Sequence, residues 1–168
     1  MKKKQFMPEL KKLAFIFFAL FILKSCSDPC NDIICLNDAD CLDGFCICQD
    51  FYQGPDCGIE ERSLYLGKYV GTTTYTDSQG NSNTYADSKE VTSSNKGVNY
   101  LKLDNEIFAL LSSPGSGVFN IPSQTPSSPL LSDSFFLGSG NFSSNILNFS
   151  ISIENNGEIV TMTFSGSK

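Results

Sequence analysis

The chain has 168 residues and a formal net charge of −6 at pH 7, from 12 Lys and Arg against 18 Asp and Glu. It contains no His, which excludes Ser–His–Asp and Cys–His catalytic arrangements and His-ligated metal sites. An acidic chain is repelled by nucleic acid phosphates, so we expect no binding to DNA or RNA. No glycine-rich phosphate loop is present, and we expect no cofactor.

Residues 1–25 combine a basic start with a short apolar run. Five Lys precede this run, which extends from Leu13 to Leu23. A membrane-spanning helix needs about 20 apolar residues, whereas a signal peptide needs about 7–15, so this segment is predicted to be an export signal. Removing its six Lys and one Glu from a chain of net charge −6 leaves a mature chain of −11.

A cysteine directly follows the apolar run. The sequence Leu23-Lys24-Ser25-Cys26 resembles a bacterial lipobox, with an aliphatic residue and a small residue before the cysteine. The resemblance implies that Cys26 is lipidated and that residues 26–29 form a lipidated tether to a membrane. Lipidation also accounts for the one cysteine that remains outside the six-cysteine framework described below. The alternative is an ordinary signal peptide, cleaved near Ser25, that leaves a free thiol.

The lipobox resemblance also implies a location in the cell envelope, at the outer membrane of a Gram-negative bacterium. One acyl chain binds a membrane only marginally, whereas the two or three chains of a bacterial lipoprotein, palmitate among them, hold it stably. Ser27 and Asp28 follow the lipid site and are similar to the surface-export signals of some Gram-negative lipoproteins. Which face of the membrane the protein occupies stays open.

Six cysteines lie within 28 residues, in the pattern C-x4-C-x5-C-x4-C-x-C-x8-C from Cys30 to Cys57. So short a segment cannot bury enough apolar surface to fold without cross-links, and the pattern predicts a disulfide framework. A zinc cluster is the alternative, but His and paired C-x2-C knuckles are absent from the sequence. Spacing alone does not choose among the connectivities.

The framework resembles an EGF-like domain over residues 30–58. Asp43-Gly44 is a two-residue hairpin signal, and Tyr52 and Gly54 stand where the family has an aromatic residue and a glycine. The resemblance implies the disulfides Cys30–Cys41, Cys35–Cys46 and Cys48–Cys57.

Nine acidic residues lie between Asp28 and Glu61. They suggest either a calcium site or a solvated acidic stalk. The spacing between Cys41 and Cys46 is shorter than the calcium-binding EGF pattern requires, so we expect the stalk and no metal.

Residues 59–63 are predicted to be a linker, and residues 64–168 an all-β domain. The candidate strands are Leu64 to Tyr75, Asn83 to Ser93, Val98 to Leu103, Ile107 to Leu111, Ser134 to Gly138, Ile146 to Ile153 and Ile159 to Phe164. Several alternate apolar and polar residues, as half-buried strands do. Asn156-Gly157 marks a hairpin turn before the last strand.

Sequential hairpins predict an antiparallel meander, which removes its exposed edges best by closing into an up-and-down β-barrel. The opening Leu66-Gly67-Lys68-Tyr69 is similar to the Gly-x-Trp start of lipocalin or calycin-like barrels, with Tyr69 in place of the tryptophan. A β-sandwich is the alternative. The expected fold class is therefore mainly β, a small disulfide-rich module followed by a barrel.

The stretch from Ser112 to Asp133 contains four Pro and many Ser, and we expect a long loop. It is either a mobile loop or a lid that covers a cavity or meets a partner. The apolar residues that would serve as the lid are Phe119, Ile121, Leu130 and Leu131.

Function is predicted from the combination of parts. Asp104 and Glu106 are paired carboxylates that could act as acid and base, but such pairs are more often solvated strand ends. We therefore expect no enzymatic activity and assign no catalytic residue. The tether, the EGF-like module and the polar β domain predict a non-enzymatic surface module that binds a protein or glycan or has a structural role. The alternative is a small barrel that carries an apolar ligand in a cavity lined by Phe135, Phe142 or Phe149.

Overall fold

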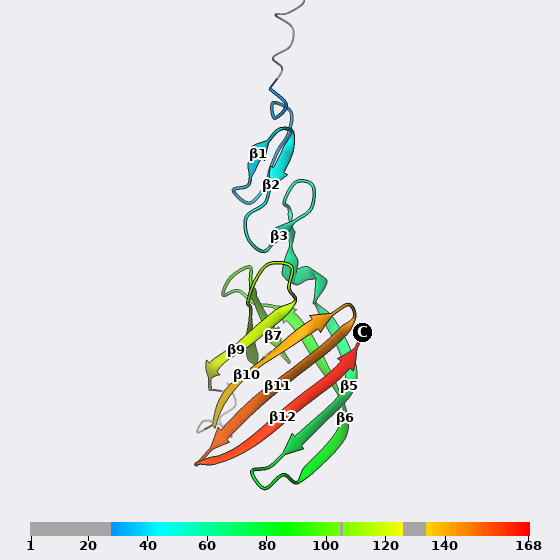
Figure 1. The fold of residues 1–168 in the computed structure, drawn as a ribbon, viewed down its shortest axis with the longest axis vertical. Coiled ribbons are helices and arrows are strands. Elements are labelled where there is room, and N and C mark those ends of the chain that lie inside the picture. The colour runs from blue at the N-terminus through cyan, green and yellow to red at the C-terminus, as the bar shows by residue number, and fades with distance from the viewer. Residues whose placement is uncertain (1–27, 105, 126–133) are drawn as a thin grey trace, which may run out of the picture.

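The computed structural model of the protein describes residues 28–104, 106–125 and 134–168. These residues form a disulfide-bonded module, a short connector and a β-barrel (Figure 1). The predicted lipid site Cys26 and the predicted lid residues Leu130 and Leu131 lie outside the described residues. No helix among the described residues is long and apolar enough to cross a membrane.

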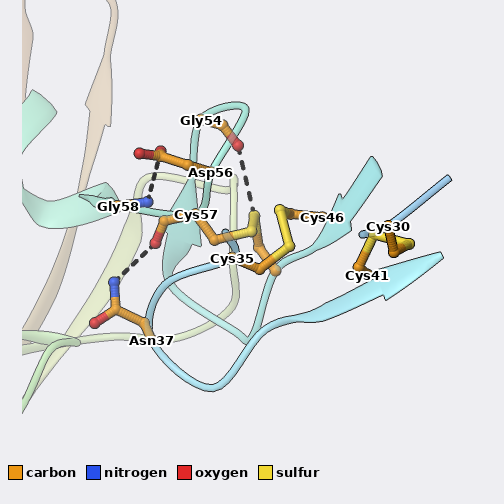
Figure 2. Close-up of a disulfide and its surroundings, with 10 residues drawn as sticks. Cys30, Cys35, Asn37, Cys41, Cys46, Gly54, Asp56, Cys57 and Gly58 are labelled. Atoms are coloured by element: carbon orange, nitrogen blue, oxygen red, sulfur yellow. Dashed lines mark hydrogen bonds between the residues drawn. A yellow bond between two sulfur atoms is a disulfide. The ribbon is translucent and has the colours of Figure 1, made fainter. Parts of the chain in front are cut away.

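Three disulfides hold the module together. Two short hairpin ladders form within it, β1 (Asp40–Leu42) with β2 (Phe45–Ile47) and β3 (Tyr52–Gln53) with β4 (Ile59–Glu60). The bonds join Cys30 to Cys41, Cys35 to Cys46 and Cys48 to Cys57, the pairs that the EGF-like resemblance implies. Around the last bond, the Asn37 side-chain amide donates to the Cys57 carbonyl at 2.8 Å and the Gly58 amide donates to Asp56 at 3.0 Å (Figure 2).

Eight antiparallel strands close into a barrel (Figure 1). They are β5 (Gly67–Thr76), β6 (Ser82–Ser93), β7 (Tyr100–Leu103), β8 (Ile107–Leu111), β9 (Val118–Gln124), β10 (Ser134–Ser143), β11 (Ile146–Asn155) and β12 (Glu158–Ser167). Each strand pairs with its neighbours in sequence, and β12 pairs with β5 to complete the circle. The predicted up-and-down barrel is confirmed, and the β-sandwich alternative is wrong.

The predicted loop from Ser112 to Asp133 contains a strand, so that prediction was wrong over Val118–Gln124. This strand, β9, pairs with β8 and β10, and both Phe119 and Ile121 are fully buried inside the barrel. Neither side chain covers a cavity or faces a partner as a lid would. Pro122 fits because the register shifts there: Gly138 pairs with Ile121 and Phe136 with Gln124, which leaves an extra residue on β9.

The core fills the interior of the barrel from the end nearest the module, where Tyr69 and Phe142 lie, to Phe136, Ile151 and Met162 farther along the barrel. The buried cluster comprises Tyr69, Val91, Leu101, Leu103, Ala109, Leu111, Phe119, Ile121, Phe136, Phe142, Leu147, Phe149, Ile151, Met162 and Phe164. Inward-facing glycines make room for its rings. A Cβ on Gly140 would lie 2.4 Å from the Phe119 ring, and one on Gly166 would lie 2.5 Å from the Phe164 ring. These two glycines therefore belong to the packing of the core.

The predicted linker is a fixed connector. After β4 it forms the 3-10 helix η1 (Glu61–Leu64). The buried Glu61 carboxylate accepts hydrogen bonds from the Tyr65 hydroxyl and the Gly115 amide, both at 2.9 Å. The Tyr65 ring stacks on Phe142 at a centroid distance of 4.4 Å, and Phe51 of the module packs against the same core. The connector therefore closes the end of the barrel that faces the module.

Two tyrosines at this closed end predict a loss of stability at alkaline pH. Burial raises the pKa of Tyr69 to about 12, and burial with the hydrogen bond to Glu61 raises the pKa of Tyr65 to about 12. In the unfolded chain tyrosine titrates near pH 10, so the unfolded state loses its protons first. The contribution of these two tyrosines to the free energy of unfolding should be constant below about pH 10 and should decrease between about pH 10 and 12.

Urea unfolding at about pH 9 and about pH 11.5 measures this effect, and we expect Tyr69 alone to contribute about 2 kcal/mol. A Tyr69→Phe variant should lose less free energy over that interval than the wild type. Equal losses in the two proteins would contradict the assignment to Tyr69.

Candidate functional site

Among the described residues, no side chain closes the barrel end opposite the module as the connector closes the other end. We call this end the distal mouth; the β5–β6 and β11–β12 turns lie there (Figure 1), and Asp104 and Glu106, between β7 and β8, line its cavity. A cavity of about 340 Å³ enters the barrel there, and its apolar wall consists of Phe136, Ile151, Ile153 and Met162. Lys89, Asp104 and Glu106 form its polar side. A second hollow of about 560 Å³ is lined by Ser134, Asn155 and Glu158 and shares Tyr75 and Ile153 with the first.

The Lys89 ammonium group forms two ion pairs at one side of the distal mouth. The Lys89 ammonium lies 2.9 Å from the Asp87 carboxylate and 2.9 Å from the Asp104 carboxylate. Lys89 and Asp87 are on β6 and Asp104 is in the β7–β8 turn, so the ammonium links the strand to the turn. Burial acts to lower the pKa of Lys89, but its hydrogen bonds to Asp104 and Asp87 outweigh burial and raise it. The Thr73 hydroxyl donates to Asp87 at 2.6 Å, and this bond, with that from Lys89, lowers the pKa of Asp87 despite burial. The Lys89 charge is therefore already compensated.

Two polar atoms at the mouth lack such compensation. Ser134 Oγ and Asn155 Oδ1 are buried and have no hydrogen-bond partner in the described part of the chain. The two residues are cross-strand partners on β10 and β11, next to the inward-facing pair Phe136 and Ile153. The distal mouth therefore combines an apolar wall, two polar atoms without a hydrogen-bond partner, and the carboxylates of Asp104, Glu106 and Glu158.

The structure separates the residues that sequence analysis singled out. Phe135 is exposed on the outer face, and Phe142 and Phe149 belong to the core, so the cavity wall that they were expected to form is built by other residues. Asp104 and Glu106 both reach the mouth, but Asp104 is occupied by Lys89 and by the Glu90 amide. Since neighbouring residues of a strand face opposite sides, the register alone decides that Phe136, and not Phe135, points inward.

A wider trough of about 710 Å³ crosses the outer face of β10, β11, β12 and β5. Its lining is mainly Ser, Thr and Asn, including Thr72, Asn148 and Thr163. It is an open, solvated sheet surface in which no described side chain carries a charge. The distal mouth is the stronger candidate site, because pockets that bind small ligands are concave, largely apolar and carry a few convergent polar groups.

Comparison with known proteins does not assign this chain to a family: no family model, no curated protein and no solved structure matches it. Within residues 28–104, 106–125 and 134–168, no group of three or more Cys, Asp or Glu side chains is placed to hold a metal ion.

Proposed function

We propose that the protein is a lipid-anchored protein of the cell envelope that acts as a non-enzymatic binding module. The observation that carries the proposal is the opposite character of the two barrel ends. The module and connector close the end that follows the predicted tether, while the cavity of the distal mouth enters the barrel from the opposite end. Figure 1 shows the module and the β5–β6 and β11–β12 turns at opposite ends of the barrel. A partner or ligand would be met on the side away from the membrane.

The module supports the tether. It has the cysteine pairing of an EGF-like domain, which would serve as a short, rigid spacer between the lipid and the barrel. The tip of the β1–β2 hairpin lies beside Pro29, since a Cβ on Gly44 would be 3.7 Å from the Pro29 side chain. That tip carries Leu42 and Phe45, which are 60% and 73% exposed. Because only Ser27 and Asp28 separate Pro29 from Cys26, the tip would lie near the lipid surface, where apolar side chains are stabilised.

The size of the cavity favours recognition of a small group over storage of a long apolar ligand. The apolar cavity, of about 340 Å³, is near the lower limit for a small-molecule pocket, and the adjoining hollow of about 560 Å³ is lined by the polar side chains of Ser134, Asn155 and Glu158 and so does not extend the apolar wall for a long chain. Phe149 and Phe164 fill the barrel interior nearer the module. The alternative function, a carrier of an apolar ligand, rests on the apolar wall of Phe136, Ile151, Ile153 and Met162.

Lipidation is tested by a Cys26→Ser variant with Ser27→Ala as the control. We expect the control to remain in the membrane fraction and to incorporate labelled palmitate. The Cys26→Ser variant should incorporate none, and most of it should leave that fraction, because the acyl chains are the proposed anchor. Wild-type labelling of the Cys26→Ser variant would contradict the proposed tether.

Binding at the distal mouth is tested by filling it. An Ile153→Trp variant places a large ring in the cavity, and Leu137→Trp places the same ring on the exposed outer face of β10. Labelled envelope extract is passed over the wild type and both variants. The proposal expects components retained by the wild type and by Leu137→Trp to be lost from Ile153→Trp, and equal retention on all three would contradict it.

A further inference from the structure

The unpaired atoms Ser134 Oγ and Asn155 Oδ1 point to a bound group at the distal mouth. Ser134 is 0% exposed, and both residues line the 560 Å³ hollow. A buried polar group without a partner is costly, and folded proteins leave few such groups unsatisfied. Because the two residues are cross-strand partners whose Cβ atoms lie about 5 Å apart, both side chains line the same hollow.

The hydrogen-bonding capacity of the pair favours a donor. Asn155 Oδ1 can only accept, and Ser134 Oγ can accept as well as donate. A group with several N–H donors can therefore satisfy both atoms. A primary ammonium carries three donors and no acceptor, which matches this arrangement.

The charges around the mouth favour the same group. Asp104, Glu106 and Glu158 line the two hollows. Lys89 is the only basic side chain among the described residues of either lining, and Asp87 and Asp104 already hold its ammonium. The remaining charge at the mouth is negative, so a cation is attracted and an anion is repelled.

The wall next to the polar pair favours an apolar stem behind the ammonium. The inward-facing pair adjacent to Ser134 and Asn155 is Phe136 and Ile153, and Met162 completes the wall. Apolar surface placed against these side chains leaves water, which contributes about 25 cal/mol per Å².

We propose that the distal mouth binds a primary ammonium group carried on a short apolar or aromatic stem. The ammonium donates to Ser134 Oγ and Asn155 Oδ1, and the stem packs against Phe136 and Ile153. This inference rests on the proposed function, because it names the chemistry recognised at the same site. A free amine and the lysyl side chain of a partner protein both supply that chemistry.

The probe is the methyl group of Met162, which lines the cavity. The chain has three methionines, and Met162 is the one within the described residues. Full chain carrying ¹³C-methyl methionine is titrated with benzylamine, benzyl alcohol and benzoate, and a Met162→Leu variant assigns the signal. Benzylamine should shift it at a concentration about tenfold lower than benzyl alcohol does, because hydrogen bonds to charged groups are the stronger ones. Benzoate should be the weakest.

A Ser134→Ala variant separates binding from folding, with the exposed Ser139→Ala on the same strand as its control. Ser134→Ala should bind benzylamine about tenfold more weakly while its melting temperature stays equal or rises, because the lost hydroxyl has no partner in the ligand-free protein. Ser139→Ala should change neither value. Unchanged benzylamine affinity in Ser134→Ala, or equal affinity for all three benzyl compounds, would overturn the inference.

Two peptides distinguish the sources of the ammonium. If a blocked Ala-Lys-Ala peptide shifts the Met162 signal as benzylamine does and the Ala-Gln-Ala peptide does not, the site accepts a lysyl side chain. If benzylamine alone shifts it, the ligand is a free amine; both outcomes support the inference. If Ile153→Trp loses envelope components that the wild type retains, but no amine shifts the signal, the ammonium assignment is wrong and the proposed function stands.

Discussion

Replacing Phe119 by Ala is expected to lower the free energy of unfolding by about 3–5 kcal/mol. The Phe119 side chain is 0% exposed, and its ring centroid lies 5.1 Å from that of Phe142. The ring also occupies the space that Gly140 leaves open, so no larger neighbour stands ready to fill the void. Urea unfolding followed by far-ultraviolet circular dichroism measures the change.

The matched control is Val118→Ala, one residue earlier on the same strand. Val118 is 43% exposed and faces outward, so its truncation should change the free energy of unfolding by no more than about 0.5 kcal/mol. The contrast arises because successive side chains of β9 point to opposite faces. Equal effects of the two substitutions would show that β9 does not close the barrel as described.

Replacing Arg62 by Met is expected to cost about 3 kcal/mol. The Arg62 guanidinium donates to the carbonyls of Ser94, Gly97 and Tyr100 at 2.5, 2.7 and 3.2 Å. A further bond of 2.6 Å runs to Glu60. Met retains much of the apolar stem but no donor, so the carbonyls of Ser94, Gly97 and Tyr100 lose the side-chain donor that ties them to the connector.

The control for Arg62 is Lys68→Met, which removes an exposed positive charge near the same end of the barrel. It should change stability by no more than about 0.5 kcal/mol. Thermal unfolding gives the difference, and amide hydrogen exchange of residues 94–100 should become faster in Arg62→Met alone. If that segment exchanges at the wild-type rate, Arg62 does not fix the connector to the barrel.

The predictable part of the fold is the part with strong alternation. Leu147, Phe149 and Ile151 are buried while Ser150 between them is exposed, as the period of two predicts for β11. The strand β10 was predicted to end at Gly138, yet it continues to Ser143, because Gly140 faces inward against the Phe119 ring. A glycine that makes room for a distant side chain is indistinguishable in sequence from one that ends a strand.

The missed strand β9 has a similar cause. Val118–Gln124 offers only two inward apolar residues before Pro122, and the surrounding Ser and Pro predict a loop. What makes it a strand is its pairing with β8 and β10 and the shift in register that accommodates the proline. None of these features is local in sequence.

The candidate site was even less predictable, because it depends on strand register. Ser134 and Asn155 stand far apart in the chain and meet only through the pairing of β10 with β11. Lys89 was not singled out, since its carboxylate partner Asp104 comes from another hairpin. Likewise, nothing in the sequence of residues 59–63 indicates that Glu61 is buried and accepts a hydrogen bond from the Gly115 amide. The cysteine spacing, in contrast, supported a family resemblance that implied all three disulfide pairs.

If the distal mouth is where this protein meets its ligand, a natural ligand should perturb the methyl group of Met162, which lines the cavity there. Envelope extract is added to the labelled full chain and to a Leu137→Met variant, whose added methyl group reports on the exposed outer face of β10. We expect the Met162 signal to shift or broaden while the signal at position 137 stays unchanged. A change at position 137 with an unperturbed Met162 signal would contradict it.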